Sequence, residues 1–225
     1  GQGGNPTTGI SPEADGLRER FQRVVRWRDR FLPGKEIWVS EFGYDTNPQS
    51  TFRAPAIGSD SAEEVQGRWI VRSYLALAAS GVDRVQLFML RDVNAANTVQ
   101  FNSSGLTAEK WNRHKPKRSW YYVATLRHVL RGTRFESEIA SGDANVRIYR
   151  FRSAERPAHD VYAVWCPTSD STEVKGFSLG LPNATAATLT TLDPESPTGR
   201  STSLPIEAGK ITFAVSERPV FIATP

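Results

Sequence analysis

The chain has 225 residues, of which 39% are hydrophobic, so it can bury a substantial core as one domain or two smaller ones. Its net charge is +4, but acidic residues lie among the arginines, so composition gives no support for nucleic-acid binding. One cysteine excludes an internal disulfide, and the three histidines lack metal-ligand spacing; we expect no metal and no cofactor. No apolar run is long enough to cross a membrane, so we expect no membrane partner. The chain begins at Gly1 without Met, which favours a processed chain or a piece of a longer one.

The first half of the chain alternates helix and strand patterns. Ser11 predicts the N-cap of an amphipathic helix that runs from Pro12 to a stop at Gly34. A short apolar strand over residues 36–40 follows it at a spacing typical of α/β units.

A second helix and strand come next. The capping box Ser61-Ala62-Glu63-Glu64 predicts a helix that ends at Gly81. The nearly continuous apolar run over residues 84–90 predicts a strand covered on both faces, and Arg91 and Asp92 follow it. A long polar loop then leads to a third helix from about Ser119 to Gly132. Two parallel strands cannot form such a sheet alone, so something else must lie beside them.

The second half loses helical periodicity, and short β-rich runs follow one another between turn residues. The spacing predicts a β-sandwich, with a turn over residues 194–199. We therefore expect two parts, residues 1–133 and 134–225. The predicted strands cover residues 135–139, 146–151, 161–165, 173–179, 187–192, 202–205, 210–215 and 219–223.

Glu41 is the main candidate for chemistry, because an apolar strand delivers its carboxylate onto a turn that Gly43 opens. Strand alternation predicts that Val39 shares the side of Glu41, whereas Trp38 faces the helix layer. Tyr44 offers an aromatic face beside the carboxylate. The alternative is structural, with Glu41 capping a helix or pairing with Arg91 or another arginine.

The segment Trp38-Val39-Ser40-Glu41-Phe42-Gly43-Tyr44-Asp45-Thr46 resembles the nucleophile segment at the end of the seventh strand of clan A glycoside hydrolases. The run from Val85 to Asp92 is similar to their eighth strand. The phrase Lys115-Pro116-Lys117-Arg118-Ser119-Trp120 is similar to the opening of their last helix, and Glu217-Arg218-Pro219-Val220-Phe221-Ile222 to the last strand of their C-terminal β-domain. The resemblance implies an α/β plus all-β fold: the last strands and helices of a (β/α)₈ barrel, followed by an antiparallel β-sandwich.

By this resemblance Glu41 is the nucleophile of a retaining glycosidase, which needs a second carboxyl as acid/base. The family places that residue after an Asn, and no Asn-Glu pair occurs in this sequence. We therefore expect the C-terminal part of a larger enzyme, or a truncated product, with little or no activity alone. Asp45 and Asp92 are weaker candidates for the second carboxyl. A loop-stabilising role is commoner for such aspartates.

An oligosaccharide or glycoside is the expected substrate, and Tyr44, Asp92 and Trp111 are the candidates to contact it. Asp92 follows the second strand, and Trp111 lies in the long polar loop at the expected rim. One departure concerns the eighth strand, where Phe88-Met89-Leu90 stands in place of a Trp that forms the floor of the sugar site in many relatives.

Two other interpretations stay open. The chain could be a non-catalytic carbohydrate-binding or interaction module in which the β-sandwich is the working part. It could also be a half barrel that closes its sheet with the missing N-terminal barrel part or in a homodimer, because open parallel edges invite association. The family resemblance alone favours a secreted or periplasmic location.

Overall fold

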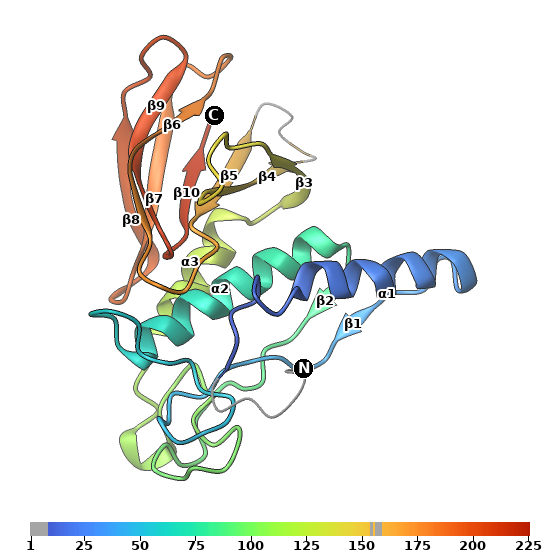
Figure 1. Ribbon diagram of the computed structural model, residues 1–225, viewed down its shortest axis with the longest axis vertical. Coiled ribbons are helices and arrows are strands. Elements are labelled where there is room, and N and C mark those ends of the chain that lie inside the picture. The colour runs from blue at the N-terminus through green and yellow to red at the C-terminus, as the bar shows by residue number, and fades with distance from the viewer. Residues whose placement is uncertain (1–8, 154, 156–158) are drawn as a thin grey trace. The chain divides into compact units, whose positions relative to one another are not determined.

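A computed structural model describes residues 9–153, 155 and 159–225 of the chain (Figure 1). The chain divides into two compact units, residues 1–120 and 121–225, and the boundary falls inside helix α3 (Arg118–Val129). This boundary comes earlier than the change in sequence pattern after residue 133, because most of α3 belongs to the same unit as the strands. Within the second unit the Thr125 hydroxyl donates a hydrogen bond to the Ser196 carbonyl at 3.3 Å.

The first unit contains two helices and a pair of short parallel strands. The helices are α1 (Leu17–Phe31) and α2 (Ala62–Ser80), and the strands are β1 (Trp38–Val39) and β2 (Arg84–Val85). Trp38 lies opposite Arg84, and Val39 lies opposite Val85. In Figure 1 α1 and α2 run side by side along the strand pair. A small core of Leu17, Val39, Ala76 and Leu77 joins these elements.

Both strands are shorter than predicted, since each has only one strand neighbour among the described residues and ladder pairing ends after two residues. The chains nevertheless continue side by side, with the Phe88 amide donating to the Phe42 carbonyl at 2.9 Å. The predicted facing of β1 is wrong. Val39 packs against the helices, whereas Trp38 is 56% exposed on the other side.

The predicted start is confirmed for α2 and wrong for α1. The Glu64 amide donates to the Ser61 hydroxyl at 3.3 Å, which confirms the predicted N-cap of α2. α1 begins at Leu17 and not at Pro12, because Gly16 lies in the left-handed region with φ of 60°. Ser11 instead caps the turn over residues 12–16 that precedes α1, and its hydroxyl accepts a hydrogen bond from the Ala14 amide at 3.3 Å.

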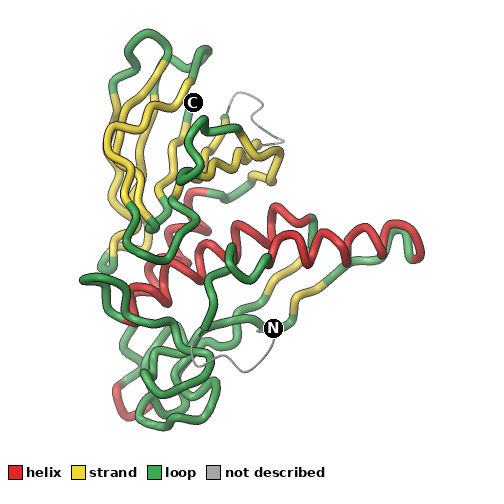
Figure 2. The backbone as a smooth tube through the Cα atoms, viewed as in Figure 1, coloured by secondary structure: helices red, strands yellow, loops and turns green. Residues whose placement is uncertain are grey.

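Long irregular segments fill the rest of the first unit, as the green tube of Figure 2 shows. They join β1 to α2 and β2 to α3, and the second contains the 3₁₀ turn η1 (Lys110–Asn112). Within the described residues, no helix has both the length and the apolar character that crossing a bilayer requires.

The second unit is antiparallel β structure. Its described strands form a six-stranded sheet in the order β3-β4-β5-β10-β7-β8 and a two-stranded sheet of β6 and β9. The two sheets share one core, to which Ile148, Val164 and Ile222 contribute from the larger sheet and Phe177 and Phe213 from the smaller. The strands are β3 (Thr133–Ile139), β4 (Arg147–Ser153), β5 (Asp160–Trp165), β6 (Glu173–Gly180), β7 (Ala187–Asp193), β8 (Ser196–Leu204), β9 (Lys210–Ser216) and β10 (Val220–Ala223).

An α/β part followed by an antiparallel β-rich part is therefore confirmed. One predicted turn is wrong in its extent. β8 begins at Ser196, inside the expected turn over 194–199, because Asp193 pairs with Ser196 across a tight hairpin.

Candidate functional site

Glu41 lies just beyond β1 and is exposed at a pocket of about 290 Å³ in the first unit. Within the described residues its carboxylate makes no hydrogen bond and no ion pair. Arg91, the cation proposed for it in the structural alternative, donates instead to the Asp92 carbonyl at 3.4 Å. Glu41 is thus an accessible carboxylate at the opening of a pocket, and the helix-cap and ion-pair arrangements are not formed.

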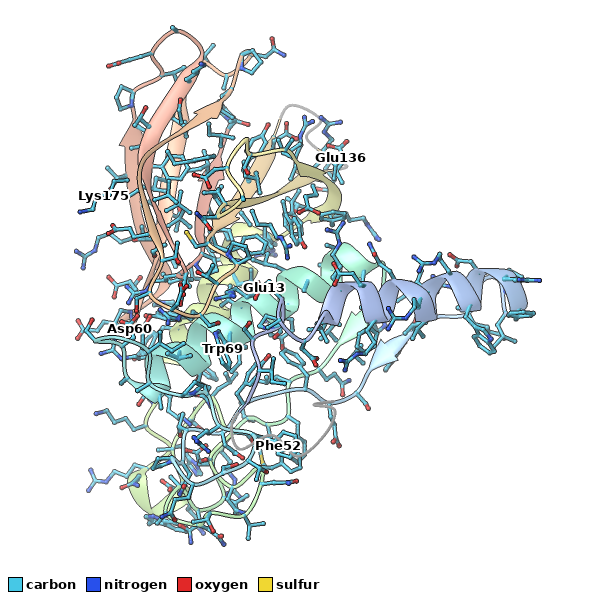
Figure 3. All side chains as sticks on the ribbon, viewed as in Figure 1. Glu13, Phe52, Asp60, Trp69, Glu136 and Lys175 are labelled. Carbon is cyan, nitrogen blue, oxygen red and sulfur yellow. The ribbon has the colours of Figure 1, made fainter. Side chains whose placement is uncertain are left out.

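Aromatic rings make one wall of this pocket. Phe52 and Phe101 stack with their ring centroids 5.4 Å apart, and the edge of Phe88 meets Phe101 at 5.6 Å. Figure 3 labels Phe52, which lies among the irregular segments of the first unit. Phe52 and Phe101 were missed by sequence reasoning, because each lies in a loop without periodicity. Phe88 was noted only as a departure from the family pattern.

Gly43 fixes the distance between the two chains that carry Glu41 and Phe88. A Cβ atom at position 43 would lie 2.4 Å from the Phe88 carbonyl oxygen, which no side chain tolerates without backbone movement. The glycine therefore permits the close approach that brings Glu41 and Phe88 to one pocket.

Tyr44 lines the same pocket but is 7% exposed. Its hydroxyl pairs with the Ser73 hydroxyl at 3.2 Å, and its ring meets the Trp69 ring at 5.2 Å, edge to face. Burial raises the pKa of the Tyr44 hydroxyl, and the Ser73 hydrogen bond opposes the shift only in part. The structure therefore brings Tyr44 to the pocket of Glu41, with its hydroxyl already engaged on α2.

Asp92 does not line this pocket. It is 2% exposed, accepts a hydrogen bond from the Gly105 amide at 2.7 Å and pairs with the Lys117 ammonium at 3.2 Å. Burial raises the pKa of Asp92 and lowers the pKa of Lys117, while their mutual attraction opposes both shifts. Lys117 also donates to the Ser103 carbonyl at 3.0 Å, so the pair ties the loop after β2 together.

Asp45 is fully buried and holds the aromatic wall. Its carboxylate accepts hydrogen bonds from the Ser50 hydroxyl at 2.5 Å, the Phe101 amide at 2.9 Å and the Ser103 amide at 3.1 Å. A carboxylate with this set of donors is a structural group. Asp45 thereby positions Phe101 in the pocket, and it does not line the pocket itself.

Asp15 is a second carboxylate at the pocket of Glu41, and sequence reasoning missed it. It precedes α1 in the segment that was predicted to be helix, and it pairs with Arg20 at 2.7 Å. Trp111 lies apart from this pocket, 65% exposed in η1. In the part of the chain that the structure describes, no three His, Cys, Asp or Glu side chains form a group suited to a metal ion.

Known proteins resemble this chain in structure but not in sequence. No family model and no curated protein matches the sequence. Solved structures do match: a family 39 glycoside hydrolase from Bacteroides cellulosilyticus WH2 has a TM-score of 0.65 at 14% identity, over 91% of this chain and 38% of that one. The fold is shared with glycoside hydrolases.

Two further solved structures match the fold of this chain. The catalytic domain of a family 30 xylanase C from Talaromyces cellulolyticus has a TM-score of 0.56 at 15% identity, over 85% of this chain and 41% of that one. A bifunctional glucanase-xylanase from a metagenome library has a TM-score of 0.59 at 11% identity, over 100% of this chain and 42% of that one. The predicted resemblance is confirmed at the level of the fold, and the chain spans about two fifths of the length of these proteins.

Chemically, the pocket joins an accessible carboxylate to apolar walls. An oxygen of Glu41 can attack an electrophile or accept a proton, because no described group occupies it. The Phe52, Phe88 and Phe101 rings offer flat apolar surface to the same ligand. The roles predicted for Tyr44, Asp92 and Trp111 toward a substrate stay predictions.

Proposed function

We propose that this chain is the C-terminal part of a retaining glycoside hydrolase, with Glu41 as its nucleophile and an oligosaccharide or glycoside as substrate. The observation that carries the proposal is the unpaired Glu41 carboxylate at an aromatic-walled pocket, in a chain that shares its fold with glycoside hydrolases. In this proposal residues 1–133 are the last part of a (β/α)₈ barrel, and residues 134–225 are a β-sandwich accessory domain.

The chemistry would be a double displacement. A Glu41 oxygen attacks the anomeric carbon as the bond from that carbon to the leaving oxygen breaks, and an acid donates a proton to the leaving oxygen. The same acid, now a base, takes a proton from water, whose oxygen displaces Glu41 and restores the carboxylate. The acid/base would lie about 5–5.5 Å from Glu41.

The described residues offer no clear candidate for that acid/base. Asp45 and Asp92 are engaged in loop hydrogen bonds, and Asp15 pairs with Arg20. We therefore propose that the preceding barrel part supplies it, and that the chain alone turns over unactivated glycosides poorly.

The test measures nucleophilic attack by Glu41 independently of proton donation by the missing acid. A 2,4-dinitrophenyl 2-deoxy-2-fluoroglycoside carries a leaving group that needs no protonation, and its fluorine slows hydrolysis of the glycosyl-enzyme. Incubation of the chain with gluco- and xylo-configured reagents should give a covalent adduct in intact-mass spectrometry, and peptide mapping should place it on Glu41.

Glu41→Gln should abolish the adduct. Glu36→Gln is the matched control, since Glu36 is an exposed glutamate just before the same strand and should leave labelling unchanged. Absence of any adduct, or an adduct that survives Glu41→Gln, would reject Glu41 as the nucleophile. Fast hydrolysis of unactivated aryl glycosides that is unaffected by Glu41→Gln would reject the whole proposal.

A further inference from the structure

The inner face of the six-stranded sheet changes from apolar to polar at one end. On β4, Ile148 belongs to the core, and Arg150 and Arg152 follow on the same face. The antiparallel register sets Arg150 opposite Tyr162 of β5 and Arg152 opposite Asp160. Two arginines, an aspartate and a tyrosine are therefore gathered where the shared core of the two sheets ends.

An open pocket of about 430 Å³ lies at this polar end, and all of its lining belongs to the second unit. The four strand residues line it together with the loop over residues 181–185, between β6 and β7, and with Thr224 and Pro225 after β10. Its volume falls in the range of about 300–1,000 Å³ that is typical of small-molecule sites. The catalytic proposal for Glu41 makes no use of it.

The charges of the pocket are fixed by mutual pairing. Asp160 accepts hydrogen bonds from Arg150 Nη2 at 2.5 Å and from Arg152 Nε at 3.2 Å. Glu136, labelled in Figure 3, pairs with Arg152 Nη1 at 2.6 Å and with Arg150 Nε at 3.3 Å. Asp160 and Glu136 together match the charge of the two guanidinium groups, so the arginines have no surplus positive charge with which to attract an anion.

Hydrogen-bonding capacity is nevertheless left over. Each guanidinium carries five N–H donors, and these pairs use only some of them. Asn183 and Thr185 add amide and hydroxyl groups from the loop, where both are exposed. Tyr162 is half-buried beside them and contributes part of an aromatic ring. The pocket thus offers rigid donors and acceptors together with an apolar surface.

We propose that this pocket binds a neutral saccharide unit. Adjacent sugar hydroxyls both donate and accept hydrogen bonds, which suits a fixed set of guanidinium, carboxylate and amide groups. The C–H face of a pyranose ring suits the exposed part of Tyr162. An anionic ligand fits less well, because it would have to displace Asp160 or Glu136 from the arginines.

The experiment is titration of the full chain with cellopentaose and xylopentaose. Binding is measured by calorimetry and by the amide chemical shifts of the chain. Binding should move the amide signals of Asn183, Ala184 and Thr185 and of Arg150 and Tyr162, and added salt should change the affinity little. Arg152→Met removes donors but leaves Asp160 and Glu136 paired with Arg150. It should weaken binding roughly tenfold or more, and Tyr162→Leu should do the same.

Arg147→Met is the matched control. Arg147 lies on the other face of β4, is also ion-paired, to Glu138 at 3.4 Å, and does not line the pocket. Equal affinities of the Arg147 and Arg152 variants would overturn the proposal. So would the absence of binding at millimolar ligand, or salt-sensitive binding of oligogalacturonate alone. Labelling of Glu41 by the fluoroglycoside should be unchanged in Arg152→Met, so this proposal and the catalytic one fail separately.

Discussion

Single residues of the first unit divide into groups that are free to react and groups that hold the fold. Glu41 makes no hydrogen bond or ion pair within the described residues, whereas Asp45 and Asp92 satisfy their oxygens with donors from neighbouring loops. All three carboxylates follow or adjoin strand-like segments, so sequence position does not separate them. What separates them is the number of donors that the folded chain brings to each.

The Asp92–Lys117 pair gives a prediction at this scale. Lys117→Met leaves a buried carboxylate without its cation and should lower the free energy of unfolding by about 3 kcal/mol at neutral pH. Loss of the cation should raise the pKa of folded Asp92 further above its value of about 3.9 in the unfolded chain. A carboxyl with a raised folded pKa binds protons preferentially in the folded state. Its ionisation therefore costs stability above that pKa, and the cost disappears as pH falls toward the unfolded value.

Urea denaturation over a pH series measures this effect. The deficit of Lys117→Met relative to the parent chain should narrow as pH falls from about 7 toward 4. Lys115→Met is the control, since Lys115 is exposed in the same loop and should behave like the parent. A deficit that does not change with pH would show that the buried Asp92 charge is not its cause.

At the scale of elements, the start of α2 follows local chemistry more closely than the lengths of β1 and β2 do. The Ser61 cap of α2 needs only atoms from residues 61–64, and its pattern is legible in the sequence. β1 and β2 need partners from elsewhere in the chain, and each has only the other in the described residues. Their apolar runs therefore predicted longer strands than the fold forms.

Removal of the α2 cap is the prediction at this scale. Ser61→Ala should cost about 1 kcal/mol, because the Glu64 amide loses its acceptor. Ser59→Ala is a neighbouring exposed control outside the cap, and it should be nearly neutral. Thermal and denaturant unfolding of both variants give the comparison, and equal effects would contradict a capping role.

The whole molecule has two compact units, and the second contains a large core shared by two sheets. Compact units with their own cores are expected to unfold locally as well as globally. A substitution in the core of the second unit should therefore destabilise that unit more than the first. The same division matters for function, because the two proposed sites lie in different units.

Ile148→Ala tests this division. Ile148 is 1% exposed in the core of the β unit, and its truncation should cost about 3 kcal/mol. Native-state hydrogen exchange should show faster exchange in the strands of residues 121–225, with α2 amides changed less. Val65→Ala, at a fully buried position of α2, should give the reverse pattern. Uniform loss of protection in both variants would mean that the units unfold as one.

The sequence by itself determined the order of elements, the cap of α2, the eight β runs of the second half and the resemblance to glycoside hydrolases. These follow from spacing, turn residues and short motifs, which act over a few residues. It also proposed Glu41, since a strand followed by a carboxylate and a glycine is a local pattern. Only the tertiary structure decided that Glu41 is unpaired, that Asp92 is paired with Lys117, and that Phe52, Phe101 and Asp15 line the pocket of Glu41. These facts depend on contacts between residues tens of positions apart, which a local pattern does not specify.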